Sequence, residues 1–561
     1  MSVLMSLLLS TAQANPALMA AAEAELERAM TLQLPEQQQP YLVSLEILDG
    51  SVATTMSSFG GVVTSASRPY RSLRAEVRVG DYQLDNSNFS ASFGERSGVV
   101  SRDLPHEDSG AALQRELWMA LDTAYKGATE QMAAKMAALE GKPPSPLPDL
   151  ARIDPLVTEP TEGGAADPAR IEEIVTALTA KLSEVSGLEE ADAIGRDWQG
   201  VRILCSSEGS RAWIPTGYTV VRVEGVTRGP DGARLRDSRS WVAPSPDTLP
   251  PLDAMLDEVE EMGDWLVSMR SAPIEEDYLG PVLFSPAASV ELFRQVMVNE
   301  LAGTPPASEP PDDYAGDPTP MPTARLGRRL LPEGWTVTDD PGLAGHAGAY
   351  THDYEGVPAE RVVLVEDGVV GDLLMSRIPR KDVAGPNGHG RSLGMDRREG
   401  LPSVVTVTPR RPRKDKKLEK RALTLARQAG RDYVLVITRL EPPALAEDFR
   451  ISFSGEGPLP GITRPLEAYR LYSDGTAEPV RGLEFIGVDR RTLRDIAVAG
   501  AQSPVTGMMD AGPGARRYSI GAVGGLPSSW SAPAVVITEM ELRGSGGAEK
   551  RVLTPPPTDS N

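Results

Sequence analysis

Alternating and helical spacings of apolar residues divide the first half of the chain into strands and helices. The clearest alternation is LRAEVRV, from Leu73 to Val79, where every second residue is apolar and the residues between them are charged. This pattern predicts a strand with one buried face and one face in water, the latter carrying Arg74, Glu76 and Arg78. Further strand-like runs, which together predict an antiparallel sheet, begin at Tyr41, Gly60, Val201 and Gly217.

Apolar residues three or four positions apart predict the helices that cover this sheet. The longest helix is expected from Ser109 to Leu139, and its apolar stripe predicts a core or interface face rather than a cofactor site. The stripe consists of Leu113, Leu117, Leu121, Tyr125, Ala128, Met132 and Met136. Shorter helices are expected over residues 15–30, 169–185, 252–270, 287–301 and 416–429.

A hairpin pattern stands at the centre of the second half. Two Val- and Leu-rich arms, 361–365 and 369–374, flank Asp367-Gly368, and two-residue hairpin loops favour such residues because they need positive φ. Gly-rich polar loops lie on both sides, which is how a rigid scaffold presents a site. Ordinary surface loops are the simpler interpretation of any single residue there. The remaining strands, with a turn at Asp474-Gly475, make this half mainly β.

Length, charge and cysteine content limit the functions open to the protein. The chain has 561 residues, enough for several domains, and a formal net charge of −22. That charge argues against a general nucleic-acid binder, because phosphate binding needs clustered Lys and Arg. Cys205 is the only cysteine, which excludes an intrachain disulfide and a Cys-rich zinc site. We interpret it as a small buried hydrophobe, since no histidine is near it in sequence; His106 close in space is the alternative.

The first fourteen residues are apolar and end in Ala12-Gln13-Ala14, a small-x-small cleavage pattern. No Lys or Arg precedes this run, so either the start codon lies upstream of the written one, or the run is an apolar N-terminal helix of a cytoplasmic protein. We expect a periplasmic or secreted protein. The run is too short to span a membrane, and no later segment qualifies.

These patterns predict an α+β protein, with an N-terminal antiparallel sheet and long helices followed by a mainly-β C-terminal domain. The expected parts are a signal peptide at 1–14, an N-terminal α/β domain at 15–275 and a β-rich domain at 276–545. A Pro-rich acidic insertion is expected at 302–323 and a disordered tail at 546–561.

Two candidate sites can be weighed from residue types alone. His346, His352 and His389 flank the hairpin and could hold zinc, but their spacing matches no ligand motif. Asp339 and Asp340 could form an acid/base pair, although neighbours on a strand point to opposite faces. The sequence contains no Gly-rich phosphate loop and no G-x-S-x-G elbow.

Two blocks of sequence carry a family resemblance. DYEGVPAERVVLVEDGVVGDLLMSR, followed by NGHGRS, is similar to the signature hairpin of the TldD/PmbA family, which comprises zinc metallopeptidases and their metal-free partner subunits. The second block is AYRLYSDGTAEPVRGLEFIGVDRRTLRDIAVAG, followed by LPSSWSAPAVVITEMELRG. The N-terminal half, through LRAEVRVGDYQLDNSNF and LWMALDTAYKGA, resembles a divergent secreted branch of that family. The resemblance implies a metalloprotease-like C-terminal domain.

The resemblance also implies where a zinc site would be. Zinc-bearing members carry His-Glu-x-x-x-His on the helix that corresponds to SVELFRQVMVNEL, with a cysteine as third ligand. Alignment places Phe293 and Val298 at the histidine positions, Arg294 at the glutamate and Ser519 at the cysteine. None of these side chains makes a useful zinc ligand or general base. We therefore expect no metal and no cofactor.

Three functions follow as hypotheses. The favoured one is a non-catalytic partner subunit that pairs with a zinc-bearing TldD-like homologue, or self-associates, and encloses a peptide held as an added strand. The second is an exported binding or structural protein that keeps the fold without proteolysis, and the third is a hydrolase with an unrecognised site. For the first, the residues expected to line or shape the peptide groove are Tyr354, Glu355, Gly356, Asn387, Gly388, His389 and Arg391.

Overall fold

The computed structural model describes residues 15–89, 97–107, 110–307, 325–383, 385–393, 397–443, 462–510 and 525–544. Several sequence predictions lie outside these residues. They are the signal peptide at 1–14, residues 308–323 of the Pro-rich insertion, Ser519 and the tail at 546–561.

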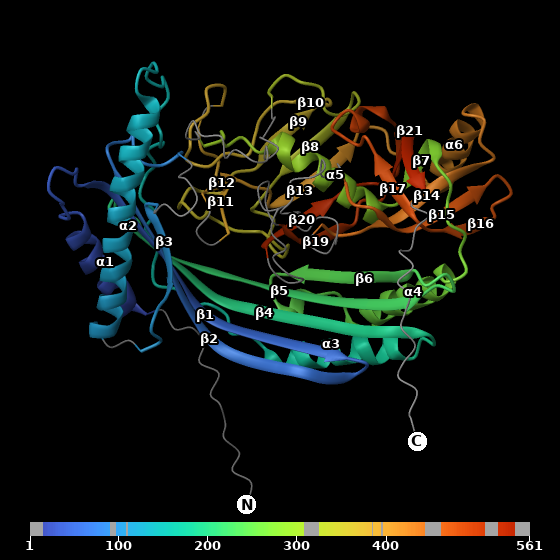
Figure 1. Ribbon diagram of the computed structural model, residues 1–561, viewed down its shortest axis with the longest axis horizontal. Coiled ribbons are helices and arrows are strands. Elements are labelled where there is room, and N and C mark those ends of the chain that lie inside the picture. The colour runs from blue at the N-terminus through green and yellow to red at the C-terminus, as the bar shows by residue number, and fades with distance from the viewer. Residues whose placement is uncertain are drawn as a thin grey trace, which may run out of the picture.

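A six-stranded antiparallel sheet forms the N-terminal domain, as predicted (Figure 1). Its strands, in the spatial order β3-β2-β1-β4-β5-β6, are β1 (Pro40–Ser58), β2 (Gly61–Val79), β3 (Val99–Asp103), β4 (Leu188–Ser206), β5 (Arg211–Arg228) and β6 (Arg234–Ala243). The runs that begin at Gly60 and Leu73 join into one long strand, β2. The β1–β2 turn places Phe59 and Gly60 at positive φ, 46° and 80°.

Four helices cover one face of this sheet at the predicted places. They are α1 (Pro16–Ala29), α2 (Gly110–Leu139), α3 (Pro168–Ser183) and α4 (Leu252–Met269). One apolar cluster joins α1 and α2 to the sheet, and a second joins α3 and α4 to it. The predicted stripe of α2 is buried at its N-terminal end, but Met136 is 49% exposed because the helix extends past the sheet there.

The C-terminal domain consists of two sheets around one buried helix. The first sheet, β10-β9-β8-β13-β20-β19, contains β8 (Trp335–Asp339), β9 (Val362–Glu366), β10 (Val369–Val370), β13 (Val404–Pro409), β19 (Val505–Asp510) and β20 (Leu526–Ser531). The second, β16-β15-β14-β7-β21-β17 with β18 beside β21, contains β7 (Tyr278–Phe284), β14 (Tyr433–Leu440), β15 (Pro465–Tyr472), β16 (Ala477–Val480), β17 (Leu483–Ile486), β18 (Ile496–Ala499) and β21 (Val535–Gly544). A short ladder pairs β11 (Gly390–Arg391) with β12 (Glu399–Gly400).

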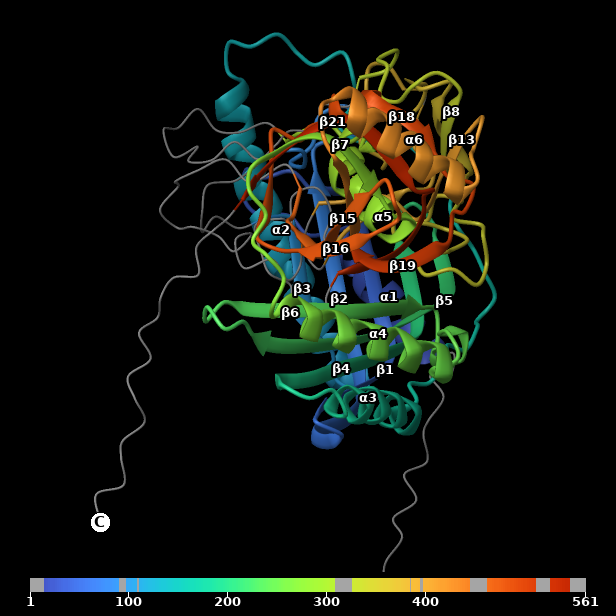
Figure 2. The same cartoon turned by 90° about the vertical axis from the view of Figure 1, so that its right-hand side faces the viewer.

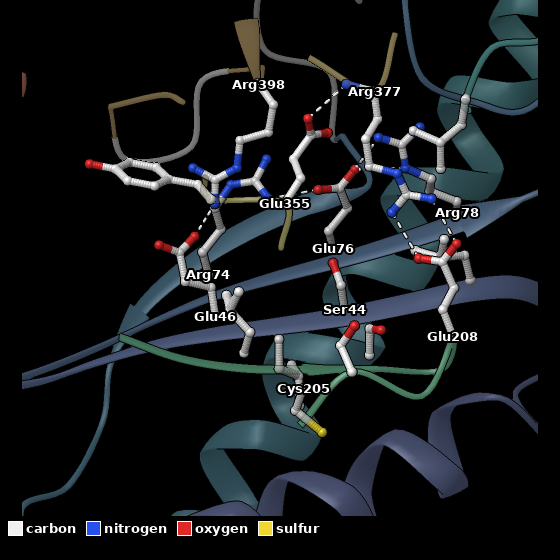
Figure 3. A pocket seen from close by; sticks show the side chains of 17 residues that line it. Ser44, Glu46, Arg74, Glu76, Arg78, Cys205, Glu208, Glu355, Arg377 and Arg398 are labelled. Atoms are coloured by element: carbon white, nitrogen blue, oxygen red, sulfur yellow. Dashed lines mark hydrogen bonds and ion pairs between the residues drawn. The ribbon is translucent and has the colours of Figure 1, made fainter. Parts of the chain in front are cut away.

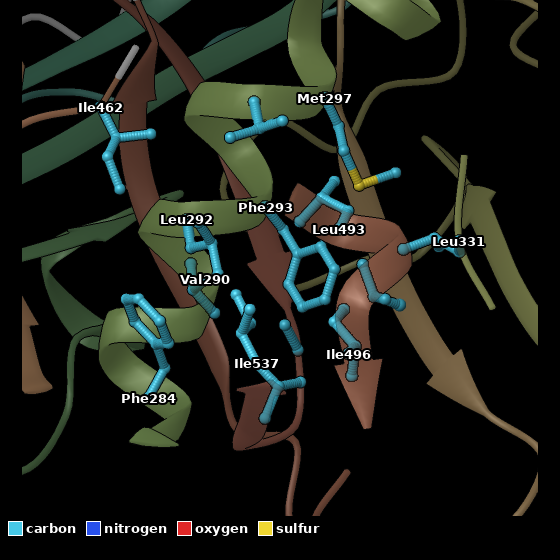
Figure 4. Packing of buried hydrophobic residues seen from close by; sticks show 14 of the residues in the cluster. Phe284, Val290, Leu292, Phe293, Met297, Leu331, Ile462, Leu493, Ile496 and Ile537 are labelled. Carbon is cyan, nitrogen blue, oxygen red and sulfur yellow. The ribbon is translucent and has the colours of Figure 1, made fainter. Parts of the chain in front are cut away.

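Helix α5 (Pro286–Leu301) is the buried helix between these sheets (Figure 4). Ser285 caps it by accepting a hydrogen bond from the Ala288 amide at 3.3 Å, and Pro286 starts its first turn. Thirteen of its sixteen residues are buried, so it has no solvent face. Helix α6 (Asp415–Gln428) packs on the outside of the second sheet.

The central hairpin forms as predicted at its turn. Asp367 and Gly368 have φ of 49° and 78°, and a Cβ at position 368 would lie 2.3 Å from the Leu331 carbonyl oxygen. The second arm is shorter than predicted, because regular pairing ends at Val370. Beyond it, the chain turns toward α5, where the Leu374 amide donates to the Leu301 carbonyl at 2.9 Å.

The predicted wet face of β2 is not in water. Arg74, Glu76 and Arg78 are each less than 10% exposed, because the C-terminal domain lies over this face of the sheet, opposite α3 (Figures 1 and 2). Alternation along β2 therefore separates an apolar face, covered by helices, from a charged face, covered by the other domain. This charged junction holds the best-defined candidate site.

Candidate functional site

A cavity of about 60 Å³ lies at the junction of the two domains (Figure 3). Its floor is formed by β1, β2 and β4, and its roof by two loops of the C-terminal domain. The charged side chains of the lining are Glu46, Arg74, Glu76, Arg78, Glu208, Glu355, Arg377 and Arg398. The cavity is thus small, enclosed by both domains and bordered by both signs of charge.

Glu76 pairs with the two arginines beside it on β2, and Asp85 also binds Arg78. Glu76 Oε2 accepts from Arg74 Nη1 at 2.6 Å, and its Oε1 accepts from Arg78 Nε at 2.8 Å. Burial would raise the pKa of Glu76, but Arg78 and Arg74 outweigh it and lower the pKa to about 2. The carboxylate stays ionised at neutral pH, and this row of charges is stable without a ligand.

Arg377 connects the roof to the floor. Its guanidinium forms a bidentate pair with Glu208 on the β4–β5 turn, at 2.7 and 2.8 Å. Its Nε also donates to the Ala151 carbonyl at 3.0 Å, while its amide donates to Glu355 Oε2 at 2.8 Å. One side chain from the C-terminal domain thereby binds two separate segments of the N-terminal domain.

Tyr354 lies among three arginines at the other end of the cavity. The guanidinium carbons of Arg202, Arg398 and Arg391 are 3.5, 5.2 and 5.7 Å from its ring centroid. Burial would raise the pKa of Tyr354, but Arg202 and Arg391 outweigh it and hold the pKa below its ordinary value of 10. Glu46 binds Arg202 and Arg398 from the sheet.

Asp353 and Glu355 form a buried pair of carboxylates next to the Tyr354 ring. A Cβ at position 390 would lie 2.1 Å from Glu355 Oε2 and 2.9 Å from Asp353 Oδ2, so only glycine fits between them. Burial and the Glu355 charge raise the pKa of Asp353 to about 8. The pair therefore carries a proton at neutral pH.

The predicted groove residues divide into two groups. Tyr354 and Glu355 line the junction cavity, and Gly356 lines a neighbouring cleft. The other four, Asn387, Gly388, His389 and Arg391, are buried inside the C-terminal domain. Asn387 Oδ1 accepts from the Met375 amide at 2.9 Å, and Arg391 donates to the Pro402 and Pro527 carbonyls at 2.6 and 2.8 Å. These bonds shape the loop; contact with a peptide stays a prediction for all seven.

The two rival sites are occupied by internal contacts. Asp339 is fully buried and accepts hydrogen bonds from Ser403 and the Val404 amide, with His389 Nε2 3.7 Å away, whereas Asp340 lies half-buried on the opposite side. Burial would raise the pKa of Asp339, but His389 outweighs it and the pKa is lowered. Within the described ranges, no three His, Cys, Asp or Glu side chains are placed to hold a metal ion.

Cys205 is buried on β4, as interpreted from the sequence, and burial raises the pKa of its thiol to about 11. His106 lies at the protein surface. A thiol with a raised pKa is a poor nucleophile at neutral pH.

The aligned zinc-motif positions lie on the buried helix α5. Phe293 packs in the main apolar cluster, with its ring centroid 6.0 Å from that of Trp335, and Val298 is also buried (Figure 4). Arg294 is buried as well and bonds Glu291 Oε2 at 2.7 Å and Asp510 Oδ1 at 2.9 Å. Helix α5 therefore carries an aromatic ring and a paired cation at these positions.

Sequence reasoning missed most of the junction. The pairs Arg377–Glu208 and Arg398–Glu46 join residues 169 and 352 positions apart, which no local pattern links. One signal was present: Arg, Glu and Arg alternate on a single face of β2, so that neighbours two residues apart can pair. Opposite charges two residues apart on one face of a strand can pair with each other, so such a face can be buried under another domain.

Comparison with known proteins bears on the second half of this architecture. Residues 277–438 match the family model described as the PmbA/TldA metallopeptidase C-terminal domain. A metalloprotease of Archaeoglobus fulgidus is 43% identical over 72 residues, 13% of this chain and 17% of that protein. Another from Methanothermobacter thermautotrophicus is 49% identical over 53 residues, 9% of this chain and 12% of that protein. The matched region thus spans less than a fifth of each relative.

Solved structures share the fold of most of the chain. TldE from Thermococcus kodakarensis superposes with a TM-score of 0.58 at 13% identity, covering 95% of this chain and 100% of that one. A Thermotoga maritima protein described as a modulator of DNA gyrase gives 0.57 at 13% identity, covering 89% and 96%. The predicted α+β fold is confirmed. Taken with the family-model match and the metalloprotease relatives, it supports membership of the PmbA/TldD family.

Proposed function

We propose that this chain is a partner subunit of the TldD/PmbA type that binds no zinc itself and completes a peptide groove for a zinc-bearing homologue. The finer parts of this statement, namely the missing zinc ligands, the hetero-oligomer and the peptide substrate, rest on the resemblance described above. No helix in the described part of the chain combines the length and apolarity that a membrane span requires. Export through residues 1–14 belongs to the same proposal.

The environment of Arg294 is the observation that carries the proposal. The alignment puts this residue where zinc-bearing relatives place a glutamate general base. Here its guanidinium is held by Glu291 and Asp510, both buried. A glutamate at 294 would face two carboxylates, so these neighbours favour a cation and disfavour the catalytic residue. Phe293 packs against Trp335, so an apolar ring occupies the position where a zinc ligand would be needed.

Co-purification from the native source tests the partnership. The expected result is a complex with a homologue that carries the His-Glu-x-x-x-His motif, with one zinc per pair and chelator-sensitive cleavage of short peptides. The lone chain, purified after zinc loading, should contain less than about 0.1 equivalent of zinc by elemental analysis. Stoichiometric zinc or chelator-sensitive cleavage in the lone chain would refute the proposal.

A variant of the partner separates the two subunits' contributions. Changing the motif glutamate of the homologue should abolish cleavage while leaving the complex intact. Changing Arg294 to Met in this chain should leave the zinc content of the assembled complex unchanged. Loss of zinc from a complex that stays assembled and folded would contradict the proposal.

A further inference from the structure

An open cleft of about 830 Å³, here called the outer cleft, lies on the other side of Glu208 from the junction cavity. Ligand pockets for small molecules and peptide ends commonly have about this volume. Both domains contribute to it. Its lining comes from the segments around Tyr41, Tyr82, Arg152, Glu208 and Gly356.

Two tyrosines and an arginine form a preorganised wall of this cleft. The Tyr41 and Tyr82 rings meet edge to face at 4.9 Å, and each hydroxyl is fixed by a carboxylate, Asp85 or Glu208, at 2.7 Å. The Arg152 guanidinium carbon lies 3.7 Å from the Tyr82 ring centroid. A stacked guanidinium keeps its N–H donors in its own plane, where a carboxylate can accept two of them.

Arg152 has its charge available. Its side chain is exposed, and none of the carboxylates in the described ranges lies within ion-pair distance of it. Glu208, one of the two acids of the lining, is already bound by Arg377 and Tyr82. This guanidinium differs from those of Arg74, Arg78, Arg377 and Arg398 in the junction cavity, each of which is paired with an internal acid.

The rest of the lining limits the ligand. Ile153, Pro155, Leu156, Val357 and Pro358 supply apolar surface beside the arginine. Asp154 adds one negative charge, which disfavours a doubly charged phosphate more than a single carboxylate. Burial lowers the pKa of His352, so this ring is neutral at pH 7 and adds no second cation.

We infer that the outer cleft binds a ligand with a single carboxylate on an apolar body, and that Arg152 holds the carboxylate. The C-terminus of a peptide with an apolar last residue and a free apolar carboxylic acid share this chemistry. The inference stands apart from the partner-subunit proposal, because it uses none of the zinc-motif positions and applies to the lone chain.

Fluorescence anisotropy tests it with an N-terminally labelled tetrapeptide that ends in Phe, as the free acid and as the amide. The acid should bind at least about tenfold more tightly than the amide, as one charge-assisted contact implies. Phenylpropanoate should displace the probe, and inorganic phosphate at the same concentration should not. If phenylpropanoate binds about as tightly as the labelled tetrapeptide, the result favours a free acid as the ligand. If phenylpropanoate binds much more weakly than the tetrapeptide, the result favours a peptide end.

Arg152→Gln supplies the decisive comparison. It should weaken binding of the acid by at least about tenfold, abolish the difference between acid and amide, and leave the melting temperature unchanged, since the residue is exposed. Arg361→Gln is the matched control, because Arg361 is 57% exposed on the central hairpin and lies outside the cleft. Equal binding of acid and amide, unaltered binding by Arg152→Gln, or no saturable binding up to millimolar probe would each overturn the inference.

Discussion

Removal of the Arg377 guanidinium should destabilise the protein strongly, because this side chain joins two segments of the N-terminal domain to the roof of the cavity. In Arg377→Met, Glu208 loses both bonds of a bidentate pair, and the Ala151 carbonyl loses its donors. Only the Tyr82 hydroxyl, at 2.7 Å, remains on Glu208. Breaking a buried pair by deleting one partner costs about 3–5 kcal/mol, mostly from the charge left behind.

The double variant Arg377→Met/Glu208→Gln separates this charge penalty from lost packing. Once Glu208 is neutral, no uncompensated charge remains, so the double variant should recover about 1–3 kcal/mol relative to the single one. The matched control is Arg170→Met on α3, whose pair with Glu173 is exposed and should contribute less than about 1 kcal/mol.

Urea unfolding followed by both tryptophan fluorescence and circular dichroism provides the measurement, because two probes reveal separate unfolding of the two domains. The expected order of stability is wild type, then Arg170→Met close behind it, then the double variant, then Arg377→Met. If Arg377→Met lies within about 1 kcal/mol of the control, the pair does not hold the domains together and the reasoning fails.

Three further predictions concern single buried groups. Burial and Glu355 raise the pKa of Asp353 from 3.8 to about 8, so folding takes up a proton between these two pH values. The free energy of unfolding should therefore fall as the pH rises from about 4 to about 8. Urea titrations at several pH values measure this slope, and Glu355→Gln should flatten it. The Tyr354 phenol should ionise below pH 10, because Arg202 lies over its ring. In a pH titration followed by tyrosinate absorbance near 295 nm, Tyr354→Phe should remove the ionisation that occurs at the lowest pH. An unchanged titration curve would refute the lowered pKa of Tyr354. Arg294→Glu should lower the melting temperature more than Arg294→Met, because the new carboxylate faces Glu291 and Asp510. Equal melting temperatures would show that the flanking carboxylates do not sense this charge.

Local patterns predicted those parts of the fold that local physics determines. The Asp367-Gly368 turn needs positive φ at two positions, and these residue types tolerate it better than most. The helices follow from apolar spacing because each buries one stripe against the sheet. Alternation along β2 shows that its two faces differ, but it does not show what covers the polar face. We therefore predicted that the charged face would be in water, and this was wrong. What covers the polar face depends on Arg377 and Arg398, residues about 300 positions further along the chain.

The same reasoning explains why the candidate site was located only in part. Tyr354 and Glu355 were identified through the resemblance, and both line the junction cavity. Their partners on the sheet could not be predicted from sequence, because Glu46 and Arg202 belong to strands whose polar residues appear solvated until the second domain is placed. Arg152 was missed because it follows a Pro-rich segment that resembles a linker.

The surroundings of α5 bear on how a zinc site could be absent from a chain that keeps the fold. Glutamate at position 294 would form a cluster of three buried acids with Glu291 and Asp510, at a cost in stability. Returning position 293 to histidine would place an imidazole in the space filled by a ring that packs on Trp335. Each single reversion would therefore lose stability before any ligand set was complete. On the partner-subunit proposal, the packing and ion pairs around α5 keep this chain from holding a metal ion.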